Sequence, residues 1–203
     1  MIKGFSLWLK IPYTLFVAVL VVTYWHQYGP QNFLWGCDIA LFCGVLALWK
    51  EWSLPASMGI LVTLIPDIIW NLDLLSRLFG VDMLGVNATA YMLNPITPLF
   101  VRLLSLFHLF LVPVLLWVIY RLGYDSRALL WQTVLTAIIL PLSYVASDPL
   151  RNINWVHGFG SLALPWSSGA VHLLLLMVLV VMLFYIPTHI LMKYYFSGRR
   201  LAK

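Results

Sequence analysis

The chain has 203 residues, of which 63% are hydrophobic and only 9% are charged. A soluble domain usually holds about 25% charged residues. This composition therefore excludes a water-soluble enzyme, a disordered chain and a disulfide-bonded scaffold. The net charge of +5 is expected to report membrane topology, and we predict no nucleic-acid partner. The sequence indicates an integral membrane protein surrounded by membrane lipid.

Six apolar segments approach the roughly 20 residues that a helix needs to cross a membrane. We predict an all-α fold, a polytopic transmembrane bundle of about six helices, in a single domain covering residues 1–203. The expected helices run approximately over residues 11–28, 32–49, 53–74, 98–120, 127–147 and 167–195. Bulky residues follow the first segment where a signal peptide would need small ones, so we expect an uncleaved first helix.

Four prolines fall inside the predicted helices, namely Pro66, Pro113, Pro141 and Pro187. A proline lacks the amide hydrogen that an α-helix uses, and its ring clashes with the carbonyl four residues earlier. We therefore expect a kink or a local opening of the helix at these positions.

Basic residues divide unequally between the two sides of the predicted bundle. One side, which includes both chain ends, holds Lys3, Lys10, Lys50, Arg121, Arg127, Lys193, Arg199, Arg200 and Lys203, and the other holds Arg77, Arg102 and Arg151. An excess of Lys and Arg marks cytoplasmic segments, so we expect the N- and C-termini in the cytoplasm. The two long connections, residues 75–97 and 148–166, then lie outside, and a site is expected to open outward.

Ionisable side chains inside membrane helices are costly and mark candidate functional sites. Most of those in this chain fall in the outer halves of the predicted helices: Asp38, Asp67, His108 and His172. Polar residues recur beside them at helical spacing: Thr63, Asp67 and Asn71; Ser105 and His108; and Gln132, Thr136, Ser143 and Ser147. Such stripes cannot face lipid cheaply and must face one another or a wet cavity. We therefore predict a polar intramembrane pocket.

A histidine oriented by a carboxylate can act as a base in acyl transfer. The candidate catalytic residues are His108 as base, Asp38 or Asp67 as its orienting group, and Ser105 or Cys37 as nucleophile, with Thr97 or water as alternatives. The candidate ligand-pocket residues are Thr63, Asn71, Thr136, Ser143 and His172. No metal site is predicted, because no metal-binding spacing such as HExxH occurs. The cofactor is unknown, and a haem between His108 and His172 stays an alternative.

The same polar residues also have a structural interpretation. Serine, threonine and glutamine often join membrane helices, and Asp38 and Asp67 could belong to a hydrogen-bond network. The chain is also rich in aromatic residues, with 10 Trp, 10 Tyr and 11 Phe, which are typical of membrane interfaces. A non-enzymatic subunit of a larger complex, or a protein that binds a lipid or pigment, is therefore the alternative to an enzyme.

Two short stretches carry a resemblance to a known family. The run from Tyr28 to Asp38, YGPQNFLWGCD, and the run from His108 to Pro113, HLFLVP, resemble the androgen-induced and YwaF-like multi-helix membrane hydrolases. That resemblance implies cleavage of hydroxy fatty acid esters by a membrane threonine and a histidine. His108 matches the histidine, whereas Trp35 stands at the threonine position and Trp117 stands where the family tends to have an acidic residue. The resemblance thus implies a hydrolase of a lipid ester.

Overall fold

The computed structural model describes residues 4–81, 88–158 and 169–196, and every regular element in these ranges is helical. The all-α prediction is therefore confirmed. In chain order the elements are α1 (Leu7–Tyr28), the 3-10 helix η1 (Pro30–Leu34), α2 (Gly36–Lys50), α3 (Ser53–Leu78), α4 (Ala90–Leu93), α5 (Leu99–Ser105), α6 (Phe107–Leu122), α7 (Ala128–Ala146), the 3-10 helix η2 (Ile153–Trp155), α8 (Gly169–Val180), the π-helical η3 (Val181–Tyr185) and α9 (Ile186–Phe196).

Five stretches are long and apolar enough to cross a membrane. They are Leu7–Tyr28, Ser53–Leu78, Leu99–Leu122, Ala128–Ala146 and Gly169–Phe196. The protein is therefore a multi-span integral membrane protein. Large apolar side chains also point away from the bundle, where lipid would contact them: Leu15, Val22, Leu109, Leu130, Leu174 and Leu183.

The remaining predicted span, residues 32–49, is shorter in the structure than in the prediction. Helix α2 has 15 residues, or about 22 Å, against a hydrocarbon layer of about 30 Å. The segment before it is not α-helical, because Pro30–Leu34 forms the 3-10 helix η1 and Trp35 is extended. Hydropathy counts these residues as apolar but does not detect the change in backbone conformation.

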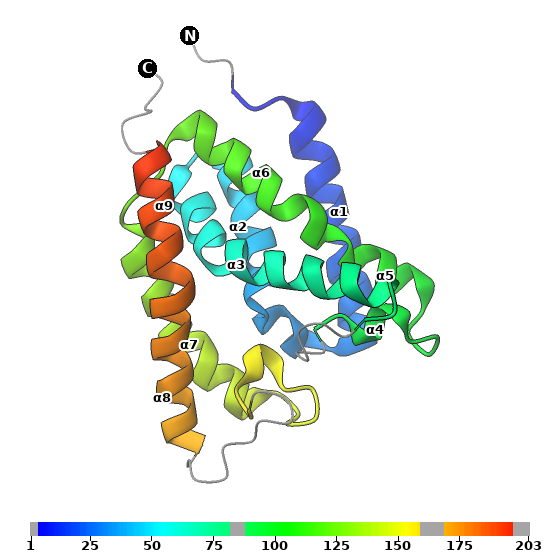
Figure 1. The fold of residues 1–203 in the computed structure, drawn as a ribbon. Helices are drawn as coiled ribbons and strands as arrows, with labels where there is room; N and C mark the ends of the chain where they lie inside the picture. Colours follow the sequence, from blue (N-terminus) through cyan, green and yellow to red (C-terminus); the bar gives the residue numbers. More distant parts are fainter. Residues whose placement is uncertain (1–3, 82–87, 159–168, 197–203) are drawn as a thin grey trace.

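Figure 1 shows that the start of α1 and the end of α9 lie at the same end of the bundle. The opposite end, which we call the distal end, carries η1, α4 and η2. Because the start of α1 and the end of α9 lie at the same end, the arrangement agrees with an even number of crossings. The side of the membrane on which these two ends lie stays a prediction.

Helix α3 is the central element and packs against α2, α6 and α7. The contact with α2 and α6 is close because α3 carries a glycine there. A Cβ added to Gly59 would lie 3.2 Å from Leu115 and 3.5 Å from Ala40. Small residues allow such approach between membrane helices, and this approach brings the polar stripe of α3 near α6.

Two of the predicted spans are interrupted. The π-helical η3 ends at Tyr185, two residues before Pro187, as expected near a proline that removes the helical hydrogen bond to the carbonyl four residues earlier. The other break separates α5 from α6 at Leu106, seven residues before Pro113, so the missing amide of that proline does not explain it. At this break the amides of Leu106 and Leu109 bond three residues back, to Leu103 and Leu106. Pro66 and Pro141 lie within α3 and α7, which continue through them.

Side-chain hydrogen bonds hold the distal connections to the helices. Asp73 Oδ2 on α3 accepts from the amide and the hydroxyl of Thr89, at 2.8 and 2.6 Å. Asn154 of η2 donates to the carbonyl of Leu34 at 2.8 Å and accepts from the amide of Gly36 at 3.3 Å. These contacts join the distal connections to α3 and to the start of α2.

Candidate functional site

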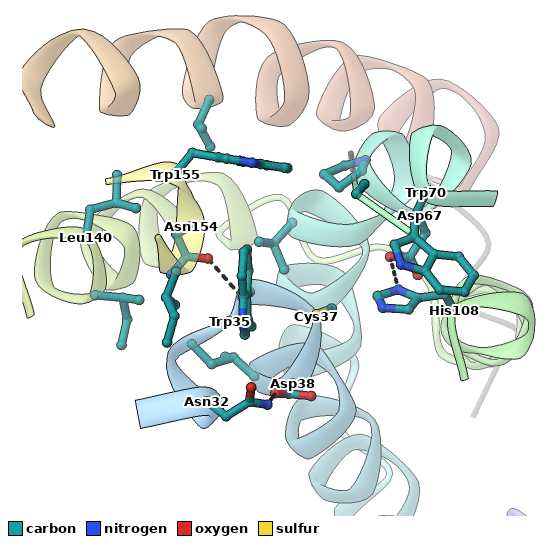
Figure 2. Close-up of a pocket in the computed structure, with 18 of the residues that line it drawn as sticks. Asn32, Trp35, Cys37, Asp38, Asp67, Trp70, His108, Leu140, Asn154 and Trp155 are labelled. Carbon is teal, nitrogen blue, oxygen red and sulfur yellow. Dashed lines mark hydrogen bonds and ion pairs between the residues drawn. The ribbon is translucent and has the colours of Figure 1, made fainter. Parts of the chain in front are cut away.

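A cavity of about 630 Å³ lies in the distal half of the bundle. It is lined mainly by apolar and aromatic side chains, with a small number of polar groups from different elements (Figure 2). Its polar lining includes Asp38, Asp67, Ser105, His108, Gln132 and Thr136. A mostly apolar cavity of this size with few polar groups is typical of a small-molecule site.

The main polar feature of the cavity is a histidine–carboxylate pair. His108 Nδ1 lies 2.9 Å from Asp67 Oδ1, and both residues are buried. The imidazole ring is stacked between two aromatic rings, with centroid distances of 4.4 Å to Trp70 and 4.1 Å to Phe107. Since a carboxylate accepts, Nδ1 carries the proton and Nε2 is left as the basic nitrogen. The pair therefore has the arrangement of an oriented general base.

Asn71 supports this pair from behind. Its side-chain amide donates to the carbonyl of Asp67 at 2.7 Å and to the carbonyl of His108 at 3.1 Å. It therefore joins α3 to α6 at the level of the pair. The sequence predicts Asn71 as a pocket-lining residue, but the cavity wall does not include it. Asn71 instead holds the backbone of Asp67 and His108 in place.

The second candidate carboxylate, Asp38, has a different partner. Its Oδ2 accepts a hydrogen bond from Asn32 at 2.8 Å, and its Oδ1 is buried without a hydrogen-bond partner. The sequence leaves open whether Asp38 or Asp67 orients His108. In the structure Asp67 does so, and Asp38 lies with Asn32 at another part of the cavity wall (Figure 2).

The candidate nucleophiles are not hydrogen-bonded to the base. Ser105 donates to the carbonyl of Val101 at 3.3 Å and pairs with the hydroxyl of Tyr24 at 2.7 Å. Cys37 lines the cavity, and Thr97 lies in the turn before α5, away from the cavity wall. Within the described ranges no serine, threonine or cysteine side chain bonds to His108. A water molecule is therefore the nucleophile that this geometry best accommodates.

The other predicted pocket residues mainly hold the walls. Thr136 does line the cavity, and its hydroxyl pairs with Tyr185 at 2.7 Å. Thr63 instead donates to the carbonyl of Gly59 on its own helix. Two residues behind the wall support η2: Ser143 accepts from Asn154 at 3.1 Å, and His172 bonds the carbonyl of Trp155 at 2.9 Å. His172 thus does not share the cavity with His108, as a haem-binding pair would require.

Three residues contribute to the site without having been singled out from the sequence. Asn32 pairs with Asp38, Trp70 stacks on His108, and Arg151 lies over the ring of Tyr28 at 5.0 Å and donates to its carbonyl. Trp70 lies one turn after Pro66 on the polar side of α3, so its helical position could have indicated it. Asn32 and Arg151 lie in connections between the long helices, where no helical periodicity predicts the direction in which a side chain points.

One ionisable group of the wall lies outside the spans. Burial raises the pKa of Tyr91 on α4, and hydrogen bonding with Ser105 and Trp70 only partly offsets this effect. The phenol is therefore neutral at physiological pH, and it closes the cavity as a hydrogen-bonding but uncharged group.

Metal chemistry is not indicated by the donor set of the described residues. In that part of the chain no group of three or more His, Cys, Asp or Glu side chains is placed to hold a metal ion. No protein-family profile, curated protein or solved structure matches the chain. The geometry of the cavity is therefore the basis on which its chemistry rests.

Proposed function

We propose that this protein hydrolyses a lipid ester within the membrane, with His108 as the general base. The observation that carries the proposal is the buried Asp67–His108 pair, which meets an apolar cavity of about 630 Å³. A buried carboxylate and histidine are costly in a membrane helix bundle unless they have a function or a partner. Here they are each other's partner, and the imidazole also lines the cavity.

The cavity suits an amphiphilic substrate. Its walls include the rings of Tyr28, Trp35 and Trp155, which offer apolar surface to an acyl chain. The polar groups are concentrated at a small number of positions, so the ester would be oriented with its carbonyl carbon near His108.

The reaction needs only water and the ester. His108 Nε2 removes a proton from water while the water oxygen bonds to the acyl carbon, and a tetrahedral intermediate forms. Collapse of this intermediate breaks the bond between the acyl carbon and the alcohol oxygen, which takes the proton from His108. The products are a carboxylic acid and an alcohol. Asp67 stabilises the imidazolium that exists between these two steps.

We also infer that both termini are cytoplasmic and that the cavity opens on the non-cytoplasmic side. The support is the distribution of basic residues among the described ends of the helices. Lys10, Lys50, Arg121, Arg127 and Lys193 lie toward the end with the start of α1, and Arg77, Arg102 and Arg151 lie toward the distal end. Reporter fusions to both chain ends test this topology, and an active periplasmic or luminal reporter at either end would contradict it.

The hydrolase is tested by comparing two histidine variants. In detergent micelles, the purified protein is given fluorogenic esters with acyl chains of increasing length. His108→Gln should lower kcat by about a hundredfold to ten-thousandfold, the usual contribution of a general base. His172→Gln is the matched control, because this buried histidine lies outside the cavity wall, and it should keep the activity.

Two results would contradict the hydrolase. One is full activity in His108→Gln with an unchanged melting temperature. The other is a wild-type protein that releases no product from any ester in the series.

A second function uses the same cavity without cleavage. The aromatic lining favours it, since rings of Trp, Tyr and Phe also suit a bound lipid or pigment in a membrane subunit. Native mass spectrometry from mild detergent distinguishes the two. A bound, uncleaved lipid or pigment, or a defined complex with other protein subunits, supports this second function.

A further inference from the structure

Asp38 is the least compensated polar group of the cavity wall. The residue is 2% exposed, and among the described residues only the neutral amide of Asn32 donates a hydrogen bond to its carboxylate. Its Oδ1 is buried with no partner. Within the described ranges no Arg, Lys or His side chain forms an ion pair with it. A buried carboxylate in this state is costly unless a cation or a hydrogen-bond donor approaches it.

The other charged groups of the wall are already engaged. Asp67 Oδ1 is paired with His108 at 2.9 Å, so this carboxylate has an ionisable partner although its Oδ2 is buried without a hydrogen bond. Arg151 lies over the Tyr28 ring and donates to the carbonyl of that tyrosine. Neither arrangement compensates Asp38, so the cavity retains a carboxyl group without a cationic partner.

Gln132 supplies a further acceptor without a partner on the same cavity wall, which also carries several aromatic rings. Gln132 is 3% exposed, and its Oε1 is buried without a partner. Tyr24 and Asp38 line the same cavity. Rings of this kind attract cations through their faces, as the position of Arg151 over Tyr28 illustrates. Unpartnered acceptors beside aromatic rings are complementary to a positively charged donor.

We propose that Asp38 is an ammonium-binding subsite, so that the lipid held in the cavity carries a primary ammonium group. The ammonium donates to the Asp38 carboxylate and lies against the aromatic wall that includes Tyr24, while its apolar chain fills the rest of the cavity. This inference rests on the proposed function in one respect only, namely that the bound lipid is called a substrate of the hydrolase. Binding is independent of cleavage.

The experiment compares three probes of equal chain length. Dodecylamine, dodecan-1-ol and dodecanoate are titrated into the full-length protein in maltoside micelles, and tryptophan fluorescence reports binding because Trp35, Trp70 and Trp155 line the cavity. The amine should bind at least tenfold more tightly than the alcohol and the carboxylate. Empty micelles given each probe supply the partitioning background.

Variants of carboxyl side chains test whether Asp38 is responsible for the tighter binding of the amine. Asp38→Asn should abolish the amine preference, and Asp38→Glu should keep part of it. Asp125→Asn is the control, since it removes a carboxylate from the connection between α6 and α7, away from the cavity wall.

Three outcomes would overturn the subsite. They are equal binding of amine and alcohol by the wild type, preference for the carboxylate, and an amine preference that persists in Asp38→Asn. The wild-type comparison decides the matter even if Asp38→Asn fails to fold. A protein that binds the amine but cleaves no ester would refute the hydrolase and leave the ammonium subsite supported.

Discussion

Replacing Asp67 by asparagine should lower kcat of ester hydrolysis and leave KM almost unchanged. Asparagine keeps the size of the side chain and can still accept from His108 Nδ1, which lies 2.9 Å from Asp67 Oδ1. It removes the negative charge that stabilises the imidazolium formed during the reaction. The effect is therefore expected in the transition state and not in substrate binding.

The magnitude follows from the distance between the two groups. Charges centred about 4 Å apart attract each other by about 4 kcal/mol at an effective dielectric constant of about 20. Since about 1.4 kcal/mol corresponds to a tenfold change in rate, losing this attraction should reduce kcat by about a thousandfold.

The assay measures kcat and KM for one ester with the wild type, Asp67→Asn, His108→Gln and the double variant. The two groups act as a unit, so the double variant should be hardly slower than His108→Gln alone. Melting temperatures in the same micelles show whether the variants are folded.

Two results would refute this reasoning. One is a folded Asp67→Asn protein with the kcat of the wild type. The other is additive losses in the double variant, which would mean that Asp67 and His108 contribute separately.

Three further predictions concern the nucleophile and the packing. Ser105→Ala should keep kcat within about threefold, because water and not this hydroxyl attacks the ester in the proposed mechanism; a loss as large as that of His108→Gln would make Ser105 the nucleophile. Asp73→Ala should lower the free energy of unfolding by about 3–5 kcal/mol in denaturant titrations, because two buried donors of Thr89 and the charged Arg77 side chain lose their acceptor. As a control, removing the exposed Arg127 side chain should leave the denaturation midpoint unchanged. Gly44→Ala should cost about 1–3 kcal/mol, because the added methyl group meets the buried hydroxyl of Tyr13; an unchanged midpoint would contradict the close packing of α1 on α2.

Hydropathy and helical periodicity were sufficient for the all-α architecture and for most of its helices. The segments around α3 and α7 are continuous apolar stretches with polar residues on one face, and their ends were predicted within a small number of residues. Both properties are local, because a membrane requires each spanning segment to satisfy its own backbone hydrogen bonds and to present apolar side chains to lipid.

The same information explains why His108 and Asp67 were recognised as candidates. An ionisable side chain within an apolar helix is conspicuous whatever its partner, because its burial is costly. Sequence spacing also placed Asp67 and Asn71 on one face of a helix. It did not indicate that Asn71 bonds the backbone at His108, since that contact joins two helices.

Only the tertiary structure decided which carboxylate orients the histidine. Asp38 and Asp67 both fall in the outer halves of their predicted helices, and the choice between them depends on how the helices are rotated against each other. In the structure α3 packs closely on α6 beside Gly59, and Asp67 lies against His108. Asn32 and Arg151 became part of the cavity wall for a related reason: they lie in connections whose direction is fixed by contacts with distant segments and not by any repeat in the sequence.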